Sequence, residues 1–236
     1  MKVLAVDTSS EMGSVALLDT ADGLMGCLSV NLLGKKNTHS NRLMPSIDFL
    51  LKILSFDLSS VELFAITLGP GSFTGLRVGL STMKGFSFAT GKPVAGVSTL
   101  EGLAWNFPYS RYPVCPIIDA RRGEVYGALY EWSGYGFDIC IEEGVYEAGE
   151  LLKFAKDGAV FTGNGSVKYR ALIEERLGGK AFFAQNDKLH VSAATIALLG
   201  TREHEKGRSF TADNLKPIYF KRPQAEEKLR DVYNHS

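Results

Sequence analysis

The sequence predicts an α/β protein of two lobes, each a mixed sheet with flanking helices, with a cleft between them. Two observations lead to this fold class. Short apolar runs of strand length alternate with longer segments of helical periodicity. The order strand, Asp, turn, strand, turn, strand, helix, strand, Gly-x-Gly-Ser, helix occurs twice, which indicates an ancient duplication. We expect residues 1–103 to form the first lobe, residues 104–206 the second, and residues 207–236 to return and complete the first.

The first unit is expected to begin with a buried strand that ends at Asp7. A hairpin turn at residues 21–23 joins the next two strands, and Thr38 and Ser40 are both suited to cap the helix that follows. The predicted elements are strands at 2–6, 13–18 and 24–33, a polar loop at 34–38, a helix at 39–54, a strand at 63–68, a helix at 73–89 and a strand at 93–97.

The second unit is expected to repeat this order, with a first strand that ends at Asp119. Its second strand alternates apolar and polar residues, as a half-buried strand does. The predicted elements are strands at 114–118, 124–132 and 137–141, a helix at 148–155, a strand at 159–161 and a helix that follows residues 163–166 and ends at 177. From residue 205 the chain is more charged, and we expect an edge segment and a terminal helix there.

The composition is that of an ordinary soluble protein. The chain has 236 residues, with 26 Lys and Arg against 26 Asp and Glu, so its formal net charge is zero. Nucleic acid binding would therefore need a local patch or a partner. The longest uncharged run has 14 residues, too few to span a bilayer, and no secretory signal follows Met1. We expect a cytoplasmic protein that does not contact membranes.

The three cysteines give no sign of a disulfide framework or a metal site. Cys27, Cys115 and Cys140 are an odd number without a C-x-x-C pair, and each lies in an apolar stretch. We therefore interpret them as reduced core thiols.

A glycine-rich loop, Gly69-Pro70-Gly71-Ser72, separates a predicted strand from a predicted helix. The N–H groups at a helix N-terminus can bind an anion, which makes Gly71 and Ser72 candidates for contact with a nucleotide. The loop matches neither the P-loop nor the dinucleotide fingerprint. The alternative is a tight turn in which the glycines let the helix approach the sheet closely.

Asp7 and Asp119 end equivalent strands and are expected at the cleft. A pair of carboxylates there could hold Mg²⁺ or activate water, or each could cap its own turn. With Gly71 and Ser72 they form the candidate site for a kinase or ATPase that uses the cleft. No metal site is predicted elsewhere, because His39 is followed at i+4 by Leu43 and not by a second ligand.

The two helices of the first unit are apolar on more than one side, which indicates a helix-against-helix protein interface. The alternative is that a loop or the C-terminal segment covers the extra face. The residues assigned to this interface are Met44, Ile47, Leu51, Leu76, Gly79, Leu80, Met83 and Phe86.

Four segments together resemble the TsaB (YeaZ) family. They are VLAVDTSSEMGSVALLD, HSNRLMPSIDFLL, LGPGSFTGLRVGLSTMKGFSFATGKPVAGVSTLEGLA and IIDARRGEVYGALY. The most specific are GPGSFTG-L-R-x-G and D-A-R-x-G-E-V-Y. The resemblance covers most of the first 130 residues and is thinner beyond. The tail segment PIYFKRP departs from the family's P-x-Y-L-R at Phe220 and Lys221.

The resemblance implies a duplicated actin-like, sugar-kinase-like fold, also called the ASKHA or RNase H-like fold. It further implies an accessory, non-catalytic subunit in the synthesis of threonylcarbamoyladenosine, in tRNA, next to the anticodon. Such a subunit would bind and activate its paralogue TsaD, with the ATPase TsaE joining the pair, and would form a homodimer through the same helices when alone. It would contact tRNA only indirectly and need no cofactor of its own, although ATP or ADP could bind in the complex.

The resemblance also explains the incomplete ligand pair. TsaD carries two histidines on a helix for its metal, whereas this chain has His39 and, at the second position, Leu43. The missing ligand argues against the metallopeptidase activity of the related glycoproteases.

Overall fold

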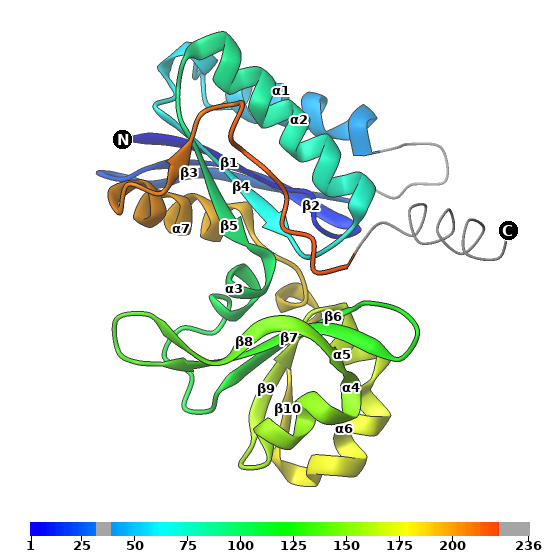
Figure 1. The fold of residues 1–236 in the computed structure, drawn as a ribbon. Coiled ribbons are helices and arrows are strands. Elements are labelled where there is room, and N and C mark those ends of the chain that lie inside the picture. The colour runs from blue at the N-terminus through cyan, green and yellow to red at the C-terminus, as the bar shows by residue number, and fades with distance from the viewer. Residues whose placement is uncertain (32–38, 222–236) are drawn as a thin grey trace, which may run out of the picture.

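The computed structural model of the chain describes residues 1–31 and 39–221, with side chains described in all of these except residues 39–41 (Figure 1). The predicted polar loop at 34–38, the predicted terminal helix and the side chain of His39 therefore lie outside the described residues.

The first half of the chain forms the elements that its periodicity predicts. The strands are β1 (Lys2–Asp7), β2 (Met12–Asp19), β3 (Gly23–Asn31), β4 (Leu63–Gly69) and β5 (Val94–Ser98). The helices are α1 (His39–Ile53), α2 (Phe73–Thr90) and the short α3 (Thr99–Ala104), which was not predicted from the sequence.

The second half contains both predicted and additional elements. They are β6 (Val114–Asp119), β7 (Glu124–Trp132), β8 (Phe137–Glu147), α4 (Ala148–Leu151), β9 (Ala159–Thr162), α5 (Asn164–Lys168), α6 (Arg170–Leu177), β10 (Ala181–Phe183), α7 (Ala193–Glu205) and β11 (Ser209–Phe210). Single 3₁₀ turns lie at Leu58–Ser60, Leu152–Ala155, Gly178–Lys180 and Asn186–Lys188. Strand β10 and helix α7 were not predicted, whereas β11 lies at the edge of the first sheet, as expected of the segment after residue 205.

The duplication is visible in the order of the strands. The first sheet runs β11-β5-β4-β1-β2-β3 and the second β10-β9-β6-β7-β8. In each lobe the first strand pairs antiparallel with the second and parallel with the fourth. Apart from the extra edge strand β11, the two sheets have the same topology, which confirms the predicted fold class.

Each sheet is buried on both faces. Along β1, Leu4 and Val6 face a core that includes α1 and α2, whereas Val3 and Ala5 face a core that includes α7. Figure 1 shows the pair α1–α2 and helix α7 on opposite sides of the first sheet. In the second lobe α3 covers one face and α4 to α6 the other. The strands need apolar residues on both sides for this three-layer packing.

Helix α7 packs on the first sheet, against β1, β2, β4 and β5. Residues 104–206 were expected to form the second lobe, but α7, which lies within this range, packs on the first lobe. The cause is the apolar face of α7, with Ile196 and Ala197, which fills the open face of the first sheet. The return to the first lobe therefore begins with α7, before residue 207, and β11 continues it by pairing with β5.

Two of the three cysteines lie at the surface. Cys115 is buried, as predicted, whereas Cys27 and Cys140 are exposed, so the prediction of core thiols was wrong for these two. The reason is their position on β3 and β8, the outermost strands of the two sheets. Within the described residues, no helix is both long and apolar enough to cross a bilayer.

Candidate functional site

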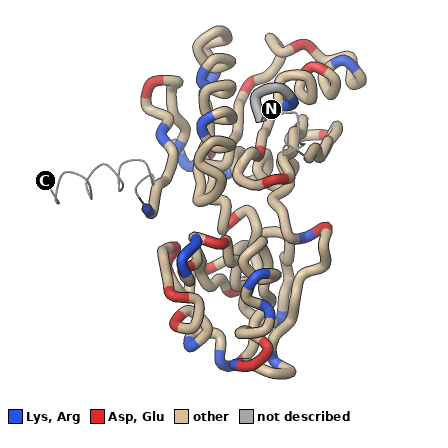
Figure 2. Tube along the Cα trace, turned by 90° about the vertical axis from the view of Figure 1, so that its right-hand side faces the viewer, with Lys and Arg blue, Asp and Glu red and all other residues tan. Residues whose placement is uncertain are grey.

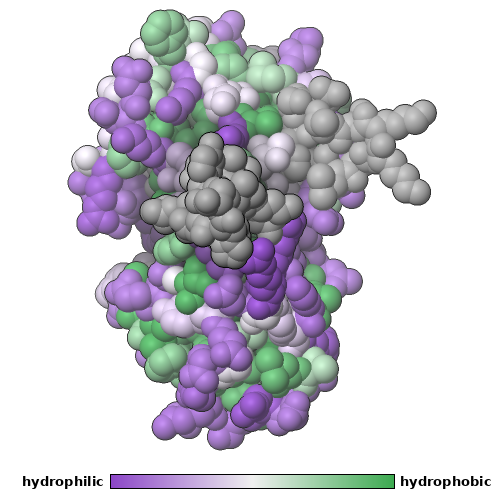
Figure 3. All heavy atoms as spheres, turned by 45° about the vertical axis from the view of Figure 1, so that its right-hand side comes forward, coloured by the Kyte–Doolittle hydropathy of each residue, from purple (hydrophilic) through white to green (hydrophobic). Residues whose placement is uncertain are grey.

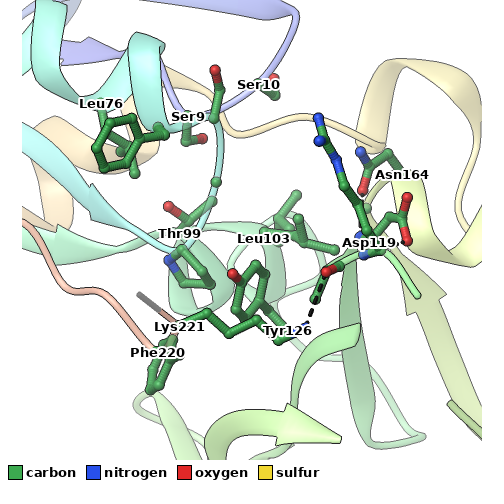
Figure 4. A pocket seen from close by; sticks show the side chains of 18 of the residues that line it. Ser9, Ser10, Leu76, Thr99, Leu103, Asp119, Tyr126, Asn164, Phe220 and Lys221 are labelled. Carbon is green, nitrogen blue, oxygen red and sulfur yellow. Dashed lines mark hydrogen bonds between the residues drawn. The ribbon is translucent and has the colours of Figure 1, made fainter. Parts of the chain in front are cut away.

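A cleft of about 890 Å³ lies between the two lobes. Loops that follow the carboxyl ends of β1, β4, β6 and β9 line it, together with residues 189–191 and the tail residues 218–221 (Figure 4). Crevices at the carboxyl ends of strands are the usual ligand sites of α/β folds. The volume is within the range of small-molecule sites.

The glycine-rich loop holds α2 against the end of β1. Ser72 caps α2 by accepting from the N–H of Gly75 at 3.2 Å, and its own N–H donates to the carbonyl of Ser9 at 2.7 Å. A Cβ added at Gly71 would lie 2.4 Å from that same carbonyl oxygen. The close-packing interpretation of the glycines is therefore confirmed, and both Gly71 and Ser72 also line the cleft.

Asp7 is fully buried and is not part of the cleft lining. Its Oδ1 accepts from the N–H of Ser9 at 3.1 Å and from Thr67 Oγ1 at 2.7 Å. Burial raises the pKa of Asp7 above its ordinary value, and these hydrogen bonds offset only part of that effect. Asp7 was expected to lie at the cleft, but its side chain is buried below the cleft surface.

Asp119 lines the cleft but is already paired. Lys168 Nζ donates to both carboxylate oxygens at 2.8 Å, and the N–H of Arg121 and the hydroxyl of Tyr169 donate at 3.0 and 3.3 Å. Partial burial acts to raise the pKa of Asp119, but the hydrogen bonds from Lys168 outweigh it and hold the pKa below its ordinary value. In this structure Asp7 and Asp119 do not form the open carboxylate pair that Mg²⁺ would require.

The position at which a second histidine ligand would stand is occupied by Leu43, which packs in the core. Leu43 is only 2% exposed and belongs to the core between α1 and the first sheet, where an apolar residue is needed. In the described part of the chain no three His, Cys, Asp or Glu side chains are arranged to hold a metal ion.

The tail crosses from one lobe to the other. The N–H of Ile218 donates to the carbonyl of Leu68 at 2.8 Å. Lys221 forms an ion pair with Glu124 and donates to the carbonyl of Ala120 at 3.1 Å.

Ring contacts of the tail with both lobes accompany these bonds. Tyr219 packs on Phe73 of the first lobe, with ring centroids 5.4 Å apart. Phe220 packs on Tyr126 of the second lobe at 6.1 Å. Phe220 and Lys221, where the tail departs from the family pattern, therefore make its contacts with the second lobe.

Most of the residues assigned to the protein interface face inward. Gly79, Ile47, Leu51, Leu76, Leu80 and Met83 are buried and Phe86 is partly buried, which leaves Met44 exposed. The assignment was wrong for the buried residues because the stripe that periodicity identifies is the one that covers the first sheet.

Other apolar side chains of α1 and α2 do reach the surface. Phe49 and Ile53 on α1 and Phe88 on α2 are exposed, and Phe88 is 86% exposed. Apolar side chains are visible among hydrophilic ones on the first lobe in Figure 3. In the view of Figure 2 acidic and basic residues are interspersed over both lobes.

Several residues that line the cleft were not predicted from the sequence. Ser9, Thr99 and His190 line the cleft, and His190 Nδ1 lies 3.2 Å from Ser10 Oγ. Burial lowers the pKa of His190. The Thr-Ser-Ser turn after Asp7 was the available signal for Ser9, whereas nothing local marks Thr99 or His190.

Two lobes with one repeated sheet topology, meeting at a cleft, define a protein of the duplicated actin-like, sugar-kinase-like class. Solved structures of this shape include "YeaZ from Pseudomonas aeruginosa", 28% identical with a TM-score of 0.74 over 92% of this chain and 99% of that one. Another is described as an uncharacterized protein with similarity to peptidase YEAZ from Pseudomonas aeruginosa, 30% identical with a TM-score of 0.77 over 93% and 99%.

Sequence comparison gives the family. Residues 35–228 match the family model described as "TsaD: tRNA N6-adenosine threonylcarbamoyltransferase". The chain is 31% identical, over 97% of both proteins, to the Bacillus subtilis protein named "tRNA threonylcarbamoyladenosine biosynthesis protein TsaB". It belongs to the TsaB family.

Proposed function

We propose that this chain is an accessory, non-catalytic subunit that binds and activates TsaD for threonylcarbamoylation of the tRNA adenosine next to the anticodon. The observation that carries the proposal is the end-to-end similarity to a protein named for threonylcarbamoyladenosine biosynthesis, at 31% identity over 97% of both chains. The match to a family model named TsaD supports a partner of the same fold.

The chemistry of the candidate groups supports an accessory role. Asp7 is sealed from the cleft, Asp119 is bound by Lys168, and the core residue Leu43 cannot ligate a metal. No catalytic constellation therefore forms from the residues that the sequence put forward.

The exposed apolar residues of α1 and α2 are the proposed contact with TsaD. Helices α1 and α2 contact each other and cover the same face of the first sheet (Figure 1). Met44, Phe49, Ile53 and Phe88 protrude from this pair. A partner of the same fold would present a similar pair, and in its absence two copies of this chain would pair about a two-fold axis.

The remaining partners are those that the resemblance to the TsaB family implies. TsaE would join the heterodimer, and ATP or ADP would bind in the complex without this chain needing a cofactor of its own. The net charge of zero and the interspersed charges of Figure 2 favour contact with tRNA through TsaD alone.

The test is tRNA threonylcarbamoylation in a mixture of TsaD, TsaE, threonylcarbamoyl-adenylate and substrate tRNA. We expect modification to depend on added chain. Omission of TsaD with this chain present should give no product, because the chain itself does no chemistry. Modification at the same rate without the chain would contradict the proposal.

A kinase or ATPase that uses the cleft is the second candidate, favoured by the cleft volume of about 890 Å³. Calorimetry with ATP and Mg²⁺, together with a phosphate-release assay on the isolated chain, separates the two. An accessory subunit gives no turnover, whereas steady phosphate release that Asp119→Asn abolishes would favour the enzyme.

A further inference from the structure

Strand β8 leaves one edge of the second sheet unpaired. It is the outermost strand of that sheet, and β7 is the only described strand that pairs with it (Figure 1). It has 11 residues, and none of them is buried. Alternate N–H and C=O groups of such an edge point away from the sheet, where they can pair with the backbone of another extended chain.

The other described edges of the two sheets differ from β8. Strands β10 and β11 have three and two residues, which is too short for a ladder of hydrogen bonds. Strand β3 has nine residues but no charged side chain. An uncharged edge gives no indication of the chemistry of a partner, whereas the edge at β8 does.

The hairpin of β7 and β8 is acidic throughout. Between residues 124 and 150 the chain has seven Asp and Glu residues and no Lys or Arg. Glu124 and Glu150, at the two ends of this segment, form ion pairs with lysines. The other five acidic residues form no ion pair within the described part of the chain; they are Glu131, Asp138, Glu142, Glu143 and Glu147.

Two of these five carboxylates lie directly opposite each other. Glu131 on β7 is the cross-strand neighbour of Asp138 on β8. Directly opposite side chains share one face of a sheet, and like charges in this arrangement repel and destabilise the pair of strands. A cation close to both carboxylates would relieve this repulsion.

A neighbouring thiol reports the same negative field. Cys140 Sγ lies 3.8 Å from Oε2 of Glu131. Partial desolvation raises the pKa of the Cys140 thiol, and the charges of Glu131 and Asp138 raise this pKa further. The repulsion therefore acts on groups of both strands.

This charge limits what can occupy the edge. Nucleic acids and anionic membranes would be repelled. A second copy paired through β8 would bring the acidic residues of two identical strands together. A basic protein segment, in contrast, would place Lys or Arg beside these carboxylates. The exposed Ile139, next to Asp138, offers an apolar contact to the methylene groups of such side chains.

We propose that the outer edge of β8 binds an extended, basic segment of a partner protein, which adds a sixth strand to the second sheet. Backbone hydrogen bonds along β8 provide the affinity, and alternate Lys or Arg side chains beside Glu131 and Asp138 provide the specificity. This surface lies on the second lobe, apart from the α1–α2 face of the first lobe, and does not depend on the proposed role with TsaD.

The test is calorimetric titration of the full chain with a peptide of about ten residues in which Lys alternates with Val. One control peptide has Glu in place of Lys. The other has Pro in place of Val, which keeps the charge but cannot form a strand ladder. We expect only the Lys–Val peptide to bind, and more weakly as salt is raised. Equal binding of the Lys–Pro peptide, or no binding of the Lys–Val peptide, would overturn the proposal.

Asp138→Asn and Glu131→Gln should each have two effects. Each substitution removes one member of the repelling pair, so urea unfolding should show a chain at least as stable as the wild type. Each also removes a charge that attracts the peptide, so the affinity for the Lys–Val peptide should fall about threefold.

Glu175→Gln is the matched control, because Glu175 is an exposed acidic residue of the same lobe but lies on α6. The affinity for the Lys–Val peptide should change by less than about 1.5-fold in this variant. Equal weakening by this control, or unchanged affinity in both Asp138→Asn and Glu131→Gln, would overturn the proposal.

Hydrogen exchange of the wild-type chain identifies the binding edge without a substitution. The bound Lys–Val peptide should slow exchange at the outward N–H groups of β8 and leave those of β3 unchanged. Slower exchange at β3 and not at β8 would overturn the site. Slower exchange at β8 on raising the chain concentration without peptide would also overturn the proposal, because the occupant would then be a second copy. None of these measurements uses TsaD or tRNA, so failure here is distinct from failure of the proposed function.

Discussion

Gly200 shows how one residue sets the distance between a helix and a sheet. It lies in α7, and a Cβ added there would be 2.5 Å from the Cβ of Ala65 in β4. The Ala65 methyl group cannot rotate away, so α7 would have to move outward. Glycine has a low helix propensity, but only a residue without a side chain lets α7 pack this closely on the sheet.

We expect Gly200→Ala to lower the free energy of unfolding by about 2 kcal/mol, the cost of overpacking a core. Gly85→Ala is the matched control, because Gly85 lies in α2 with nothing within 4 Å of the added Cβ. That variant should be stabilised by up to about 1 kcal/mol through helix propensity. Urea unfolding measures both, and equal effects of the two substitutions would contradict the packing argument.

Asp7 leads to a prediction on pH. Its pKa in the folded chain is raised above the ordinary 3.8, so the folded state holds a proton that the unfolded state releases. The contribution of Asp7 to the free energy of unfolding therefore falls as pH rises above about 3.8. Asn at this position does not titrate.

The measurement is urea unfolding of the wild-type chain and of Asp7→Asn from pH 4 to pH 7. We expect the stability of the wild type relative to the variant to decline with rising pH. A difference that stays constant, or that grows with pH, would show that the carboxyl is not held in its neutral form by burial.

At the scale of elements, α1 and α2 each have one apolar face in the core and further apolar residues on the surface. The core face can be predicted from the sequence, because its apolar residues recur with the helical repeat. Ile53 and Phe88 do not belong to that stripe, and only their exposure in the folded lobe identifies them. A charge at Met83, which is fully buried, would unfold the lobe and would not report on an interface.

We expect Phe88→Asp and Ile53→Asp to weaken association with TsaD and with a second copy by roughly 2 kcal/mol or more each. Tyr135→Asp is the control, since Tyr135 is also highly exposed but lies in the second lobe. Light scattering gives the dimer and pull-down gives the heterodimer. If the control weakens both complexes as much as Phe88→Asp does, the α1–α2 face is not the contact.

At the scale of the whole molecule, the tail is a direct link between the lobes. It hydrogen-bonds to the end of β4 through Ile218 and reaches the second lobe through Lys221 and Phe220. A Cβ added at Gly69 would lie 2.7 Å from the carbonyl oxygen of Ile218. A side chain at position 69, at the end of β4, would therefore clash with the tail.

We expect Lys221→Ala to speed hydrogen exchange at the N–H of Ile218, because the tail loses its anchor on the second lobe. Global stability should change by less than about 1 kcal/mol, since the ion pair is partly exposed. Lys206→Ala removes a comparable exposed ion pair with Glu203 in α7. Faster exchange at Ile218 in that control as well would indicate general loosening and not a local link.

Much of the fold could be predicted from the order of patterns. Strands β1, β2, β4, β6 and β7 follow from local apolar runs, and the start of α2 follows from Ser72, which caps it. Strand β10 was missed because it has only three residues, and α7 was missed although it contains Ile196, Leu198 and Leu199. Their partners are distant in sequence, and only the open face and edge of a formed sheet give them a place.

The duplicated α/β units and the family could be predicted from sequence, since both depend on local periodicity and on the order of the motifs. Tertiary structure decided which side chains are reachable. Asp7 and Met83 looked functional but are enclosed by the core, whereas Ile53 and Phe88 reach the surface. Exposure and hydrogen-bond satisfaction depend on what lies across the sheet or the cleft, and local patterns carry no record of that.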